Sequence, residues 1–279
     1  MKRETEDIYR EVQHLYGVPY VSAIHKSLAT QPGLLTWAWH KVAPAFRTGE
    51  AQKAAWAAAA EVEAPALDPI PWQAVNAWGM TRHDVTSVRA AAETFLRVSP
   101  VNMMFAALIK LRLAGVMPKG ATDSGALTPW QPPAAPATAP PPMIDVERAD
   151  ATTRDLAMLF ATNRDDEPFV PGLYCMLLNW PGLAGHLGTV LPPRMRGAVA
   201  VSDALRSRID DAAATLLRPA PEPPCAAPSP SARAYFAHIA STYRKTSPEL
   251  VIAGKLIRDA LPSDEPTRGS EQRLGRLGS

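Results

Sequence analysis

The feature that most constrains this 279-residue chain is a series of short motifs that occurs twice, in one order and at nearly constant spacing. Val18-Pro19 returns 152 residues later as Val170-Pro171, and Pro32-Gly33 returns 149 residues later as Pro181-Gly182. Further pairs follow at an offset of 148: Phe95 and Tyr243, Ser99-Pro100 and Ser247-Pro248, Leu108-Ile109 and Leu256-Ile257. Several matches in the same order indicate an internal duplication.

Each half carries the pattern of helices, and strand-like alternation is absent. Residues 84–97 place Val85, Val88 and Phe95 on one face, with Asp84 as the expected N-cap and a new helix expected to start at Ser99-Pro100. The other expected helices cover 4–16, 51–63, 152–162, 197–217, 231–245 and 248–260. The sequence therefore predicts an all-α fold in which two homologous helical repeats pack as a pseudo-dimer.

A proline-rich stretch, PWQPPAAPATAPPP at 129–142, separates the halves. Each proline lacks the backbone N–H and fixes φ, so this stretch cannot be helix interior. We predict a first helical repeat over 1–116, a Pro/Ala-rich linker over 117–145, a second repeat over 146–262 and a flexible tail over 263–279.

Composition excludes several classes of partner. The formal net charge is +2 and no long basic run occurs, which argues against nucleic acid. The start, MKRETEDIYREV, has no apolar signal region, and we expect no apolar run to approach membrane-spanning length. Two cysteines, Cys175 and Cys225, fit reduced thiols, so we expect a cytoplasmic protein.

The two Val-Pro blocks resemble a known family. "LYGVPYVSAIHKSLATQPGLLTWAW" resembles the first-repeat signature of the group I 2-haloacid dehalogenases, and "VPGLYCMLLNWPGL" resembles the second, ending in Asn179-Trp180-Pro181. The resemblance implies an all-α pseudo-dimer with its active site between the repeats. It also implies an aspartate near the start of the second Val-Pro helix, which activates a water to displace halide next to a carboxylate, without metal or covalent ester.

This sequence departs from the family at that aspartate. Counting along the motif places Leu173 or Tyr174 there, and neither side chain can act as a carboxylate base. The nearest acids are Asp165, Asp166 and Glu167. They either restore the base or form a solvated cap on an exposed turn.

The resemblance also implies a set of pocket residues. Tyr20 matches an aromatic wall, Ala23 replaces a bulky aromatic and widens the pocket, and Tyr243 matches a tyrosine of the symmetry-related helix. Together with the residues at the lost aspartate, the expected substrate-binding set is Tyr20, Ala23, Ser99, Asn102, Leu173, Tyr174 and Tyr243. Helices starting at Ser99-Pro100 and Ser247-Pro248 would present free N–H groups to an anion, unless both serines are simply N-caps.

Other chemistry-bearing residues give weaker signals. His25 lies on the first Val-Pro helix and is a third catalytic candidate beside Asp166 and Glu167, although a lone histidine is more often structural. The histidines have no metal-ligand spacing and the chain has no nucleotide-binding motif, so we expect no metal and no cofactor. Nothing near Cys175 would activate its thiol.

Three functions follow as alternatives. The first is an enzyme that displaces a halide or sulfate by an amine inside the same carboxylate-bearing substrate, closing an aziridine-type ring in natural-product biosynthesis. A sulfotransferase would then be its partner, and a Lys or Arg near the cleft would hold the leaving group. The second is a hydrolytic 2-haloacid dehalogenase that uses Asp165, Asp166 or Glu167. The third is a non-catalytic helical partner subunit.

Overall fold

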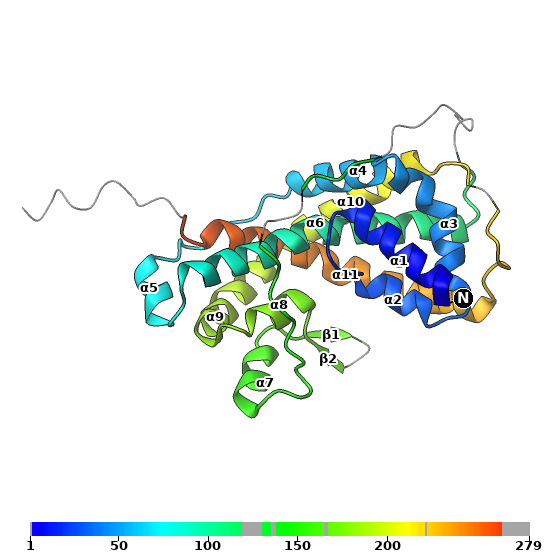
Figure 1. Cartoon of the computed structure of the whole chain (residues 1–279). Coiled ribbons are helices and arrows are strands. Elements are labelled where there is room, and N and C mark those ends of the chain that lie inside the picture. The colour runs from blue at the N-terminus through cyan, green and yellow to red at the C-terminus, as the bar shows by residue number, and fades with distance from the viewer. Residues whose placement is uncertain (1, 119–129, 135–137, 165–166, 221, 264–279) are drawn as a thin grey trace, which may run out of the picture.

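The structure is a computed structural model that describes residues 2–118, 130–134, 138–164, 167–220 and 222–263. It is built from helices and one hairpin (Figure 1). The helices are α1 (Lys2–Tyr16), α2 (Ala23–Ala29), α3 (Leu34–Arg47), α4 (Glu50–Ala60), α5 (Trp72–Ala77), α6 (Arg82–Leu113), α7 (Ala151–Met158), α8 (Gly172–Leu177), α9 (Pro181–Gly197), α10 (Val199–Leu216) and α11 (Pro230–Ala260). The predicted all-α class is confirmed.

One small antiparallel hairpin departs from the prediction that strands are absent. Strand β1 (Thr162–Arg164) pairs with β2 (Glu167–Phe169), with Thr162 opposite Phe169. The helix expected over 152–162 ends at Met158 instead. A two-stranded ribbon adds no layer to the fold, but it lies directly before the second Val-Pro motif.

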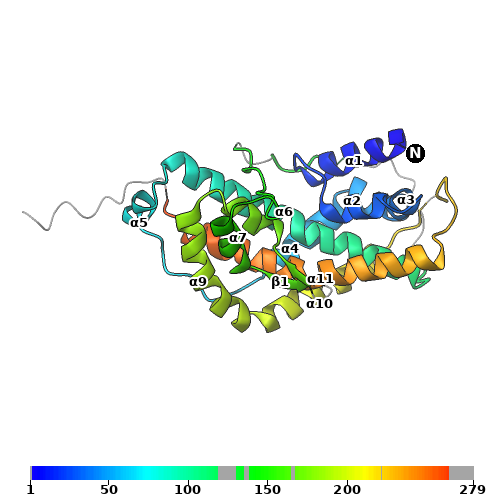
Figure 2. The same ribbon diagram turned by 90° about the horizontal axis from the view of Figure 1, so that it is seen from below.

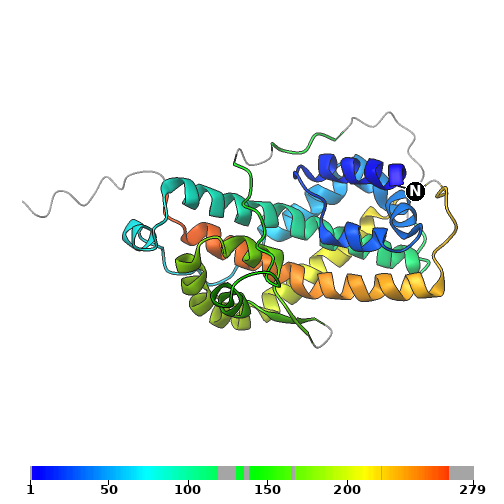
Figure 3. The ribbon, with the colours of Figure 1, turned by 60° about the horizontal axis from the view of Figure 1, so that its bottom comes forward.

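Helices α6 and α11 form the centre of the molecule and run antiparallel (Figure 3). Arg89 donates hydrogen bonds to the carbonyl oxygens of Arg258 and Pro262, at 3.2 and 3.1 Å. A Cβ added at Gly254 would lie 3.2 Å from the carbonyl oxygen of Ala92. The missing side chain at Gly254 therefore allows the two helix backbones to approach closely.

Both central helices run without a break through an internal proline. Pro100 lies inside α6 and Pro248 lies inside α11, so the expected helix ends and new helix starts at these positions are wrong. A proline in a helix interior costs about 3 kcal/mol because one hydrogen bond is lost and the ring crowds the preceding turn. Burial of the apolar residues on either side outweighs that cost, since most of α6 from Val98 to Ile109 is buried.

The start of α6 is fixed by a capping box, and the N-cap lies three residues before the predicted one. Thr81 is the N-cap, and its hydroxyl accepts from the Asp84 N–H at 3.2 Å. The Asp84 carboxylate accepts in return from the Thr81 N–H at 2.7 Å, so Asp84 is the third helical residue and not the N-cap. Trp180 donates to the same carboxylate at 2.9 Å, which ties the start of α9 to α6.

The remaining helices pack around α6 and α11, and equivalent helices of the two halves follow each other in the same order along the chain. Helices α4 and α10 pack against each other and on α6, with α1, α2 and α3 toward one end and α7, α8 and α9 toward the other (Figures 1 and 2). Arg82 and Pro230, which begin α6 and α11, are 148 residues apart, as the repeated motifs require. This order supports the two homologous repeats, which stay a prediction.

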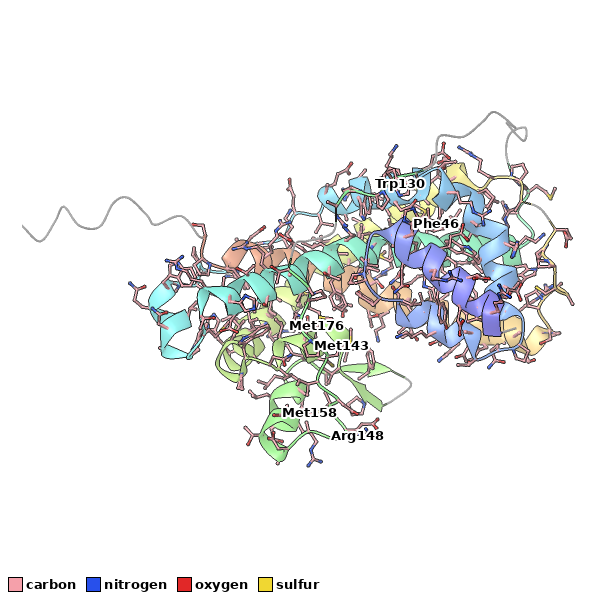
Figure 4. The ribbon with its side chains drawn as sticks, viewed as in Figure 1. Phe46, Trp130, Met143, Arg148, Met158 and Met176 are labelled. Atoms are coloured by element: carbon pink, nitrogen blue, oxygen red, sulfur yellow. The ribbon has the colours of Figure 1, made fainter. Side chains whose placement is uncertain are left out.

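The described part of the expected linker, 117–118, 130–134 and 138–145, forms neither helix nor strand. It lies on the protein surface: the Trp130 indole donates to the carbonyl oxygen of Leu15 at 3.1 Å (Figure 4). Arg97 donates to the carbonyl oxygens of Pro133 and Ala134 at 3.1 and 2.8 Å. The rest of this segment and nearly all of the expected tail lie outside the described residues.

Helix α6 also corrects the statement that no apolar run reaches membrane-spanning length. By length and composition it is long and apolar enough to cross a bilayer. Inside the protein, however, 78% of its most apolar window is buried. Its apolar side chains are thus explained by the packing of a core helix.

Candidate active site

A cavity of about 510 Å³ lies where the central helices meet both Val-Pro motifs. Five of the residues expected to bind substrate line it: Tyr20, Ala23, Ser99, Asn102 and Tyr243. They come from the segment that leads into α2 and its first residue, from α6 and from α11, so both halves of the chain contribute. The folded chain thereby brings together side chains that are more than 200 residues apart.

Hydroxyl and amide groups line the deep part of this cavity. Ser99 of α6 and Ser247 of α11 are each 3% exposed, and both line the cavity. Ser22 and Asn102 are also buried there, and the Ser22 Oγ and Asn102 Oδ1 atoms have no hydrogen-bond partner. Buried polar atoms of this kind cost free energy unless a ligand or water satisfies them.

Two tyrosines stand close enough to influence each other. Burial raises the pKa of Tyr20, and the nearby Tyr243 phenol raises it further. The Tyr20 phenol therefore keeps its proton at neutral pH and can donate a hydrogen bond. Apolar side chains such as Phe95, Val98 and Leu250 complete the walls.

Leu173 and Tyr174, expected at the pocket, lie elsewhere. Both are buried and neither lines the cavity, because α8 turns its other face toward it with Gly172 and Cys175. Tyr174 stacks on Phe160 at a centroid distance of 4.5 Å. Residues three apart on a helix share a face. Because α8 starts at Gly172, Gly172 and Cys175 share the face that lines the cavity.

Cys175 lines the cavity but is a poor nucleophile. Its Sγ donates to the Val170 carbonyl oxygen at 3.5 Å. Burial raises the pKa of the Cys175 thiol to about 11, so the reactive thiolate is scarce at neutral pH.

The acids expected near the base position are only partly described. Asp165 and Asp166 lie outside the described residues, and Glu167 is described only by its backbone, as the first residue of β2. Pro168, the next residue, lines the cavity. The backbone of Glu167 therefore lies next to the cavity lining.

Two other carboxylates line the cavity and were overlooked in the sequence. Asp145 and Glu147 are exposed residues of its lining. Met143 and Met158, labelled in Figure 4, line the same edge and are 48% and 51% exposed. We call this edge the mouth. Sequence reasoning missed the two acids because they lie at the junction of the expected linker and the second repeat, where no periodicity marks a buried face.

The expected anion site is not found in the described part of the cavity. No helix starts at Ser99 or Ser247, so their segments offer no free helical N–H groups. Among the described lining side chains there is no Lys, Arg or His to hold a leaving group. Within this described lining, only neutral hydrogen-bond donors could hold a leaving group.

His25 lies in the core and does not line this cavity. It is fully buried, its ring centroid is 4.6 Å from that of Phe105, and its Nε2 is 3.5 Å from the Tyr16 hydroxyl. Burial lowers the pKa of His25 to about 3, so the ring is neutral near pH 7. Among the described residues, no group of three or more His, Cys, Asp and Glu is placed to hold a metal ion.

Comparisons with known proteins agree with this fold. The family model described as "Halocarboxylic acid dehydrogenase DehI" matches residues 19–169. A D-2-haloacid dehalogenase mutant solved with D-2-CPA and a D-2-haloacid dehalogenase solved with L-LA each share 17% identity with this chain, at a TM-score of 0.64 over 92% of both chains. A further D-2-haloacid dehalogenase mutant has a TM-score of 0.65 at 17% identity over 92% of this chain and 91% of its own.

No curated protein matches the chain. The family model covers more than half of the 279 residues, and the structural likeness extends the same fold over nearly the whole chain. The chain therefore belongs to the DehI family, the group I 2-haloacid dehalogenases that its two Val-Pro motifs resemble.

Proposed function

We propose that this protein catalyses nucleophilic displacement at an sp³ carbon by an amine of the same substrate, closing an aziridine-type ring in natural-product biosynthesis. One observation carries the proposal: residues of both halves line a cavity, but α8 beside it, with the sequence GLYCML, has no carboxylate to activate water. A pocket that has lost a base for water can still align a substrate that brings its own nucleophile.

The reaction balances without a cofactor. The nitrogen lone pair forms the new C–N bond while the bond from carbon to the leaving group breaks. The leaving group departs with its electron pair as halide or sulfate, and the nitrogen then loses one proton to solvent. Alignment of the two reacting atoms is worth up to roughly 7–11 kcal/mol in favourable intramolecular systems.

The cavity side chains divide these tasks. Ser99 orients the carboxyl group of the substrate, and Asn102 and Ser22 orient its other polar groups, through neutral hydrogen bonds. The Tyr20 phenol, which keeps its proton, donates to the departing anion. Apolar walls around Phe95 and Val98 exclude the water that would compete with the amine.

A sulfate leaving group implies a partner. Sulfate must first be placed on a substrate hydroxyl, which is the reaction of a sulfotransferase, so we propose that this class of enzyme supplies the substrate. A halide leaving group would need no such partner.

Hydrolysis of a 2-haloacid is the second candidate, favoured by membership of the family. The base for water would then be Asp165, Asp166 or Glu167, of which Glu167 is followed directly by the cavity residue Pro168. A carboxylate on this hairpin would replace the one missing from α8.

One substrate separates these candidates. 3-Chloroalanine carries an amine next to the carbon that bears chlorine, and it is incubated with the protein in ¹⁸O-labelled water. Ring closure releases chloride and yields aziridine-2-carboxylate without label, whereas hydrolysis releases chloride and yields labelled serine. 2-Chloropropionate, which has no amine, is the control. The proposal fails if chloride release is as fast from the control, or if the product carries ¹⁸O.

A further inference from the structure

The charged groups that line the cavity are all of one sign in the described part of the chain. Asp145 and Glu147 stand at the mouth, and the described lining contains no cationic side chain. The Asp145 carboxylate pairs with Arg148 at 3.4 Å, but the Arg148 side chain is 89% exposed. An ion pair so exposed to water holds its partners weakly, so the mouth keeps a negative potential.

The mouth segment is held in place by its backbone. The Ile144 N–H donates to the Cys175 carbonyl oxygen on α8 at 3.0 Å, and Asn179 donates to the Pro142 carbonyl oxygen at 2.9 Å. The Glu147 N–H donates to the Asp145 Oδ1 atom at 3.2 Å, closing a short turn. Both carboxylates are therefore presented by an anchored segment at the cavity edge.

Deeper in the cavity, two buried polar atoms lack partners. Ser22 is the N-cap of α2, yet its hydroxyl makes no capping bond, and it is 4% exposed. The Asn102 Oδ1 atom is unpartnered at 5% exposure. A carbonyl oxygen only accepts and a hydroxyl accepts as readily as it donates, so this pair fits a ligand that brings N–H donors.

We infer that the natural substrate enters as a cationic amine, attracted by Asp145 and Glu147 and received by the Ser22 and Asn102 oxygens. The inference rests on the proposed function, since the recognised amine is also the internal nucleophile. The ammonium group releases one proton to solvent before attack, which frees its lone pair, and the ring nitrogen releases a second proton after the C–N bond forms. Amines of ordinary basicity are protonated near neutral pH, and a negative mouth raises their local concentration. Hydrogen bonds from the nitrogen to the two buried oxygens then hold it inside the cavity.

Binding to the whole protein tests this without turnover. Isothermal titration calorimetry compares hexylamine with hexanoate, two probes with the same apolar chain and opposite charge. We expect about tenfold tighter binding of hexylamine, which is about 1.4 kcal/mol. The preference should shrink in higher salt because the attraction is electrostatic.

The double variant Asp145→Asn/Glu147→Gln should abolish most of this preference. Asparagine at 145 keeps the side-chain oxygen that accepts from the Glu147 N–H, so the turn is preserved. The matched control, Glu63→Gln/Asp68→Asn, makes the same charge change at two exposed acids outside the cavity lining and should leave the preference intact.

Equal affinity for the two probes, or a preference that survives the double variant, would overturn the inference even if ring closure is observed. Conversely, the amine preference stays measurable if 3-chloroalanine is not cyclised. The two proposals can therefore fail separately.

Discussion

Ser99 of α6 and Ser247 of α11 line one cavity, although they are 148 residues apart and belong to opposite halves of the chain. Each lies near the middle of a long helix and is followed by a proline inside that helix. The antiparallel packing of α6 on α11 brings these equivalent positions together. A site at such a junction takes its shape from both halves at once.

The first prediction concerns the side chains that position the substrate. Asn102→Ala and Tyr243→Phe should each lower kcat/KM for ring closure by about tenfold or more, because a misplaced substrate loses alignment. Removal of a true base would nearly abolish turnover instead. The matched control is Tyr235→Phe on the same helix, which removes a hydroxyl bonded to the Ser27 carbonyl oxygen outside the cavity. Unchanged turnover in both cavity variants, with folding intact by circular dichroism, would reject this assignment.

The second prediction concerns water as a nucleophile. Since α8 carries no carboxylate, purified protein should release little chloride from 2-chloropropionate. Ion chromatography of the released chloride measures this. If release is rapid and is lost in Asp166→Asn or Glu167→Gln, the hairpin supplies the base. Rapid release that persists in both variants would show that the motif is misaligned.

The third prediction is a pH dependence of stability caused by His25. In the folded protein its pKa lies near 3, compared with 6.5 in an unfolded chain, so the unfolded state binds more protons between these values. The free energy of unfolding should therefore fall as the pH drops below 6.5, by up to about 1.4 kcal/mol per pH unit.

His25→Leu removes this titration and serves as the comparison. Urea unfolding at pH 7 and pH 5 should show the wild type losing roughly 2 kcal/mol more than the variant. Carboxylates elsewhere titrate equally in both proteins and cancel in the difference. Parallel losses in the two proteins would mean that His25 is not neutral and buried.

The fourth prediction tests the packing of Trp130 on the first half. Gly49 has φ +76°, and a Cβ there would collide with the Trp130 ring. Gly79 has a similar φ of +72° but nothing within 4 Å. Gly79→Ala should cost about 1 kcal/mol from backbone strain alone, and Gly49→Ala about 2 kcal/mol more because the indole must move.

Chemical denaturation of the two glycine variants measures the difference. Adding Trp130→Ala to Gly49→Ala should recover the part of the loss that is due to the collision. Equal losses at Gly49 and Gly79 would show that the proline-rich segment does not rest on α4.

The sequence by itself determined the helical class, the family and the lack of a carboxylate in the second Val-Pro helix. Paired motifs at a constant offset and the amphipathic periods predict helices, because both depend on local pattern. The residues of α8, which follow Pro171 directly, include no carboxylate. Tyr20, Ala23, Ser99, Asn102 and Tyr243 were identified as cavity residues through the resemblance carried by the motifs.

Only the tertiary structure decided how those motifs are used. Proline is a local signal for a helix start, but burial of the surrounding apolar residues keeps α6 continuous through Pro100. His25 packs in an aromatic core beside Phe105. On α8, Gly172 and Cys175 face the cavity, whereas Leu173 and Tyr174 do not. Asp145 lies at the mouth because the neighbouring Ile144 N–H bonds to the Cys175 carbonyl oxygen on α8. No local sequence pattern encodes such a contact. Long-range packing sets which face of each segment meets the cavity.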